Sequence, residues 1–208
     1  MKKTIGVVAF AAALGASAGA LAQDAAPKPT IVLVHGAFAD SSGWNDVITI
    51  LEKDGYRTIA PPNQLRSVAG DAANVSAVVK SIAGPVVLVG HSFGGMVITG
   101  AANGNPNVKA LVYVAGFMPD TGDSANSLVA KFPGSMIGKV VAPVPLADGG
   151  VDLYIRPDLF HDVFAADIPE ERTHLMAVTQ RPLALADADG AAGDPFRSSR
   201  WQLAQFTL

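Results

Sequence analysis

The stretch GHSFG at residues 90–94 places one serine between two glycines, directly after the apolar run VVLV at residues 86–89. Between a strand and a helix, the spacing G-x-S-x-G holds a serine on a sharp turn, where its hydroxyl can attack a carbonyl carbon. Glycines are needed there because side chains at residues 90 and 94 would collide with neighbouring backbone. The pattern indicates that Ser92 is a nucleophile. An ordinary glycine-rich turn between a strand and a helix is the alternative.

A second stretch, HGAF at residues 35–38, ends the first apolar run of the chain. Acyl transfer needs backbone N–H donors that are placed in advance around the developing oxyanion. The amides of Ala37 and Phe93 are the predicted donors, and Gly36 lets the backbone approach closely. A plain turn is the alternative. His35 lies within the turn itself, so we interpret it as a structural histidine rather than a base.

Short apolar runs alternate with stretches of helical spacing over the first half of the chain. The expected strands are 30–36, 56–62, 86–90 and 108–116, and the expected helices are 41–55, 71–83 and 93–103. This alternation predicts a mostly parallel sheet with right-handed crossovers and helices on both faces. From about residue 118 to 190 the alternation of apolar runs and helical spacing stops, which indicates an insertion or lid.

The segments IVLVHGAF, VVLVGHSFGGMV and ALVYVAGFMPD resemble the α/β-hydrolase superfamily, in particular its small esterases and hydroxynitrile lyases. The resemblance runs from about residue 30 to about 195. It implies an α/β-hydrolase domain over 30–195 with a lid insertion over about 118–190. It also implies a triad ordered as serine, acid and histidine. The nucleophile motif is specific for the fold and says little about the substrate.

The general base and the acid are not identified by the sequence. After Ser92 the chain has two histidines, His161 and His174, and both fall in the lid-like region without a preceding buried strand. Each is a weak candidate for the base, and a lid or surface histidine is the alternative. Asp120 follows the fourth expected strand and is a weak candidate for the acid.

The last thirteen residues, 196–208, read FRSSRWQLAQFTL, and their composition differs from that of the alanine-rich segment before them. The resemblance implies two further strands in this part of the fold, each leading to a catalytic residue. We therefore expect a chain shortened at its C-terminus that lacks the last strands of the sheet. A frameshift or truncation near Pro195 explains this most simply, and a natural short form is the alternative.

The first 22 residues have the layout of a secretory signal peptide, with two lysines, an apolar stretch and a small-x-small cleavage pattern ending at Ala22. A membrane anchor is the alternative. Residues 23–29 resemble a flexible leader. We expect export to the periplasm or the medium, with cleavage near Ala22 and no stable membrane anchor.

The composition of the chain limits the classes of protein to which it could belong. Of 208 residues, 50% are hydrophobic and 16% charged, which favours a folded domain. The net charge of −3 without a basic cluster disfavours nucleic acid, and no cysteine is present for disulfide or thiol chemistry. No lysine follows the glycines of residues 90–94, so a phosphate-binding P-loop is excluded. No cofactor or metal is implied.

The leading interpretation is a serine hydrolase of carboxylic esters with small or medium apolar groups. Its activity in this chain is expected to be low because the catalytic histidine is missing. Phe38, Met118, Phe160 and Phe164 are the expected lining of an apolar substrate pocket. Hydroxynitrile-lyase or cofactor-free haloperoxidase-like chemistry on the same fold is one alternative, and a non-catalytic or ligand-binding protein is another. The sequence does not determine the oligomeric state.

Overall fold

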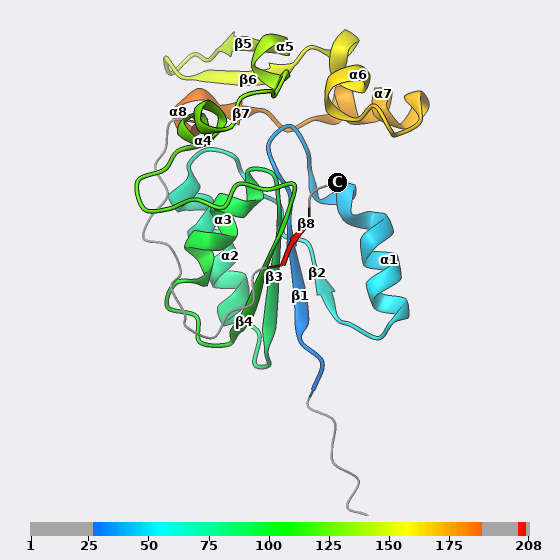
Figure 1. Cartoon of the computed structure of the whole chain (residues 1–208), viewed down its shortest axis with the longest axis vertical. Coiled ribbons are helices and arrows are strands. Elements are labelled where there is room, and N and C mark those ends of the chain that lie inside the picture. Colours follow the sequence, from blue (N-terminus) through cyan, green and yellow to red (C-terminus); the bar gives the residue numbers. More distant parts are fainter. Residues whose placement is uncertain (1–26, 189–203, 207–208) are drawn as a thin grey trace, which may run out of the picture.

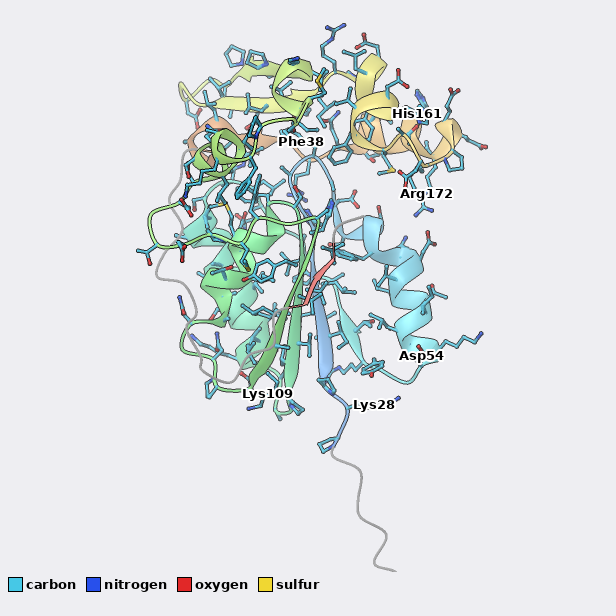
Figure 2. The ribbon with its side chains drawn as sticks, in the orientation of Figure 1. Lys28, Phe38, Asp54, Lys109, His161 and Arg172 are labelled. Atoms are coloured by element: carbon cyan, nitrogen blue, oxygen red, sulfur yellow. The ribbon has the colours of Figure 1, made fainter. Side chains whose placement is uncertain are left out.

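The computed structural model describes residues 27–188 and 204–206. The predicted signal peptide, most of the leader and most of the tail lie outside these residues. Figure 1 shows a central sheet with α1 on one side and α2 and α3 on the other, and a second layer of helices and strands over one edge. At the start of the described chain, Lys28 donates to the carbonyl of Asp54 and lies 4.7 Å from the centroid of the Tyr56 ring (Figure 2).

The main sheet has five parallel strands in the order β2-β1-β3-β4-β8. The strands are β1 (Thr30–Val34), β2 (Thr58–Ile59), β3 (Val86–His91), β4 (Val108–Val114) and β8 (Ala204–Phe206). The predicted parallel sheet is confirmed. In β1 and β3, Val34 pairs with Gly90, so the segments that follow both strands emerge at the same carboxyl edge. β8 comes from the atypical tail, so that tail supplies one short strand next to β4.

Helices cover both faces of this sheet, as the continuous apolar runs predict. They are η1 (Ser41–Trp44), α1 (Asn45–Lys53), α2 (Val68–Lys80) and α3 (Gly94–Ala102). Side chains alternate along β1: Ile31 and Leu33 pack with Trp44 on the α1 side, whereas Val32 and Val34 belong to the larger core on the side of α2 and α3.

The second layer, here called the upper layer, comprises the described residues from 125 to 188. It contains α4 (Ala125–Lys131), α5 (Ile137–Val140), β5 (Val141–Pro145), β6 (Val151–Ile155), η2 (Pro157–Leu159), α6 (Phe160–Phe164), α7 (Glu170–Thr179), β7 (Leu183–Ala184) and α8 (Leu185–Ala188). Its three strands form an antiparallel sheet, β5-β6-β7, which the sequence did not predict. Strand β5 was not predicted because it contains Pro143 and Pro145, and proline is tolerated only in an edge strand.

Arg66 joins the loop after β2 to the upper layer. Its guanidinium contacts the carboxylate of Asp152 in β6 at 2.5 Å and donates to the carbonyl of Pro182 at 2.9 Å. The amide of Ala184 in β7 donates to the carbonyl of Leu65 at 3.0 Å. Elsewhere, Arg172 of α7 pairs with Asp46 of α1 at 2.8 Å. Polar contacts therefore hold the upper layer to the main layer at two places.

Helix α2 begins at Val68, three residues before the predicted start at Asp71. The side chain of Ser67 caps it by accepting from the amide of Gly70 at 3.0 Å. Asp71 has a different role: its buried carboxylate accepts from the amides of Gln64 and Leu65, each at 2.9 Å. Burial raises the pKa of Asp71, and these two hydrogen bonds oppose the increase.

We predict that Asp71→Ala lowers the free energy of unfolding by about 1–3 kcal/mol, because the buried amide of Leu65 and the partly buried amide of Gln64 lose their acceptor. Urea denaturation at neutral pH measures the change. The matched control is Asp46→Ala, which removes an exposed ion pair and is expected to change stability by less than about 1 kcal/mol. Equal losses in the two variants would contradict this role for Asp71.

Candidate active site

Ser92 lies on the turn between β3 and α3 with a φ of 52°, a conformation that non-glycine residues seldom adopt. Three backbone hydrogen bonds hold the turn. The Ser92 amide donates to Val114 at 3.3 Å, and its carbonyl accepts from Gly95 and Phe117, each at 3.0 Å. The predicted strained turn is confirmed. Within the described residues, the half-buried Ser92 hydroxyl makes no hydrogen bond.

The glycines around Ser92 leave no room for side chains. A Cβ atom on Gly90 would lie 2.6 Å from the carbonyl oxygen of Gly94, and one on Gly94 would collide with the carbonyl of Val34. A Cβ atom on Gly36 would lie 2.7 Å from the Cβ of Ser92. Backbone therefore surrounds the serine on several sides, as the motif predicted.

Positive φ angles recur along the same edge of the sheet. Each of the loops that follow the first four strands holds one non-glycine residue in this conformation: Phe38 (61°), Leu65 (59°), Ser92 (52°) and Ala115 (40°). Such residues cost of order 1–3 kcal/mol each and cluster at active sites and ligand clamps. The carboxyl edge therefore holds the candidate site, and it is the edge where ligands of open α/β folds bind.

The amides of Ala37 and Phe93 flank Ser92 from two different loops. Ala37 follows Gly36, which touches the serine, and Phe93 follows the serine directly. In the described part of the chain, neither amide donates a hydrogen bond to a protein acceptor. Phe93 also precedes the N-terminus of α3, where the helix dipole favours negative charge. Both residues are buried, and their amides are the candidate donors to an oxygen placed beside Ser92.

Three of the four predicted pocket residues meet. The rings of Phe38 and Phe164 are 6.3 Å apart and perpendicular, and those of Phe160 and Phe164 are 4.8 Å apart. Phe38 belongs to the loop after β1, whereas the other two belong to α6, so the upper layer meets the loop after β1 through aromatic contacts. Met118 is 47% exposed and is outside these ring contacts.

The two histidines near the turn are engaged elsewhere. His35 Nε2 accepts from the amide of Asn63 at 2.8 Å, and its Nδ1 lies 2.9 Å from the carbonyl oxygen of Gly36. The His91 ring packs edge-on against Trp44 with centroids 6.4 Å apart. Burial lowers the pKa of both imidazoles, so both are neutral at pH 7.

The weak candidates for base and acid lie in the upper layer or next to it. Thr173 Oγ1 is 3.2 Å from Nδ1 of His161, His174 is exposed, and the amide of Asp120 donates to Asp123 at 3.0 Å. Figure 2 shows His161 on α6 at the outer side of the upper layer, apart from Phe38. None of the four histidines of the chain hydrogen-bonds to Ser92.

Sequence reasoning missed Asn63 and Asp71, which fix the loop after β2 beside His35. The signal for both was weak, because a polar residue after a strand is also typical of an ordinary loop. Among residues 27–188 and 204–206, no cluster of histidine and acidic side chains could hold a metal ion. None of the helices in the same range is long and apolar enough to cross a membrane.

Comparisons with known proteins found a matching family model and curated relatives. A family model described as "Alpha/beta hydrolase family" matches residues 31–204. A carbendazim hydrolyzing esterase of Nocardioides sp. is 35% identical over 113 residues, covering 48% of this chain and 47% of that protein. Methylesterase 1 of Arabidopsis thaliana is 28% identical over 175 residues, covering 74% of this chain and 66% of the relative.

The fold also matches a solved structure. A polyneuridine aldehyde esterase superposes with a TM-score of 0.70 at 22% identity, covering 86% of this chain and 79% of that one. This likeness shows an α/β-hydrolase fold. The chain spans about half the length of the first of the two curated relatives (47%) and 66% of the second.

We predict that Gly36→Ala slows the reaction of Ser92 with a fluorophosphonate probe by roughly 10²-fold, because displacing a reacting group by about 1 Å has an effect of this size. The added Cβ would press on the Cβ of Ser92 and the carbonyl of His91. Intact-mass spectrometry over time measures the labelling rate. Gly43→Ala is the control, since nothing lies within 4 Å of its added Cβ. Unchanged labelling in Gly36→Ala would contradict the close approach of these two loops.

Proposed function

Because the chain belongs to the alpha/beta hydrolase family, we propose that it is a serine esterase with Ser92 as its nucleophile. The observation that supports this best is the position of Ser92 on a left-handed turn, next to two backbone amides that donate to no protein acceptor among the described residues. The curated relatives described above are esterases, which supports ester bonds as the target.

In the proposed reaction, Ser92 Oγ attacks the ester carbonyl carbon and its proton passes to a base. The carbonyl oxygen becomes an oxyanion and receives hydrogen bonds from the amides of Ala37 and Phe93. The tetrahedral intermediate collapses, the alcohol leaves with a proton, and an acyl group stays on Ser92. Water then hydrolyses this acyl-enzyme and restores the serine.

The aromatic contacts support apolar esters as substrates. Phe38, Phe160 and Phe164 bring apolar surface from two layers to the carboxyl edge. Such surfaces bind small apolar groups, while a few backbone donors set their orientation. In this proposal the upper layer acts as a lid, and the acyl or alcohol group of a small or medium ester packs against the three rings.

No histidine of the chain is positioned as a general base for Ser92. Serine is a poor nucleophile at its free pKa, and the four histidines are bonded elsewhere, packed against an aromatic ring, or exposed. We therefore propose that this chain turns over esters slowly, by about 10⁴-fold or more relative to an enzyme with a complete triad. The same observation favours a second candidate function, in which an apolar ester-like ligand binds without turnover.

We predict that Ser92→Gly raises the free energy of unfolding by about 1 kcal/mol while abolishing covalent reaction with esters. Glycine adopts a positive φ without the steric cost that other residues incur there. Ser92→Ala is the matched control, because it also removes the hydroxyl but keeps the Cβ atom and the strain. Urea denaturation of the three proteins measures stability. A Ser92→Gly variant that is no more stable than Ser92→Ala would argue against stored strain at the nucleophile.

We also predict that added imidazole accelerates the hydrolysis of 4-nitrophenyl butyrate by the wild-type protein, because it supplies the base that Ser92 lacks. The rate above that of Ser92→Ala, measured at increasing imidazole concentration, isolates the protein-dependent part. Turnover without imidazole that His161→Ala abolishes would identify His161 as the base and overturn the proposal of slow turnover. Cleavage of a cyanohydrin without ester hydrolysis would point to lyase chemistry instead.

A further inference from the structure

His35 makes two hydrogen bonds that together fix its tautomer. The ring is 2% exposed, its Nε2 is 2.8 Å from the amide nitrogen of Asn63, and its Nδ1 is 2.9 Å from the carbonyl oxygen of Gly36. A backbone N–H only donates, so Nε2 is the unprotonated acceptor. A neutral imidazole then carries its proton on Nδ1, and this proton is donated to the Gly36 carbonyl.

The Gly36 carbonyl belongs to the same peptide group as the Ala37 amide. A peptide group is planar and trans, so its C=O and N–H point in opposite directions and rotate together. A hydrogen bond that fixes the carbonyl oxygen of Gly36 therefore also fixes the direction of the Ala37 N–H. Gly36 lies directly against Ser92, which places this peptide group at the nucleophile.

We propose that His35 is a positioning residue: through the Gly36–Ala37 peptide group, its Nδ1–H holds the Ala37 amide in the orientation that receives the oxyanion. This inference rests on the proposed esterase function. It gives a role in catalysis to a buried histidine that makes no hydrogen bond to Ser92.

The surroundings of His35 hold the ring in place. The side-chain amide of Asn63 donates to the His35 carbonyl at 2.7 Å, so this one residue contacts both the ring and the backbone of His35. The charged and titratable groups that face the ring are Asp40 and Asp71, which favour a protonated imidazole, and Arg181 and His91, which disfavour it. Burial outweighs them and lowers the pKa of His35, which keeps Nε2 free to accept.

Two substitutions separate positioning from simple tethering of the loops. His35→Asn places an amide N–H where Nδ1 was and removes the acceptor at Nε2, whereas His35→Gln places an acceptor near Nε2 and removes the donor at Nδ1. Hydrolysis of 4-nitrophenyl butyrate, with imidazole present at a fixed concentration, gives kcat and KM for both. We expect His35→Gln to lower kcat by about 10–100-fold with KM within about twofold, since losing an oxyanion donor outright costs roughly 10²–10³-fold. We expect His35→Asn to keep kcat within about threefold of the wild type.

The reverse order, or equal losses in both variants, would overturn the proposal and leave His35 as a tether. Circular dichroism and urea denaturation show whether each variant folds. ¹⁵N NMR of the wild-type protein provides a readout that needs no activity: the ring shifts must show protonated Nδ1 and unprotonated Nε2, and the opposite tautomer would refute the proposal.

The NMR readout also separates this inference from the proposed function. If the wild-type protein neither hydrolyses esters nor reacts at Ser92, the proposed function fails. The orientation of the Gly36–Ala37 peptide group is then judged from the Ala37 amide resonance. We expect this resonance to shift more in His35→Gln than in His35→Asn, and equal shifts would count against His35 as its determinant.

Discussion

At the carboxyl edge of the main sheet, the backbone at residues 36, 90 and 94 lies closer to its neighbours than any Cβ atom permits. This close approach brings the loop after β1 against the turn after β3. Ser92 occupies a left-handed conformation between them, held by backbone hydrogen bonds to β4 and to the segment that follows it. Ser92 and the two predicted oxyanion donors therefore come from loops that meet at this edge.

Strain of this kind needs compensation nearby, and buried polar contacts provide it. Asp71 fixes the loop after β2 through two backbone amides, and Asn63 ties the same loop to His35. Each bond satisfies a buried group that would otherwise be unpaired, at a cost of about 1–3 kcal/mol. The left-handed Leu65 lies in this same loop, and its carbonyl accepts from β7. The edge that holds Ser92 is thus also the edge that anchors the upper layer.

The parallel sheet and the strained serine followed from the sequence because both depend on local rules. Apolar runs that end at glycine predict buried strands, and G-x-S-x-G leaves few conformations for Ser92. The antiparallel β5-β6-β7 sheet did not follow, since Pro143 and Pro145 argue against a strand unless its place at an edge is known. The role of Asp71 was also hidden, because it depends on a loop that reaches the helix only after folding.

The expected pocket lining remains a prediction, although some of its residues contact one another. Phe38 and Phe164 are far apart in the sequence, and their rings lie 6.3 Å apart in the fold. Met118 differs because its apolar side chain lies on the surface, and hydrophobicity alone does not reveal on which side of a loop a residue lies. The roles of the histidines could not be predicted either, because tertiary packing determines their hydrogen-bond partners.

We propose that Ser92, at the carboxyl edge of the main sheet, is a covalent nucleophile. Peptide mapping by mass spectrometry after reaction with an excess of fluorophosphonate tests this claim directly. We expect a single phosphonyl adduct on Ser92, formed slowly and absent after denaturation of the protein before reaction. An unmodified Ser92, or equal labelling of other serines such as Ser41 and Ser81, would contradict it.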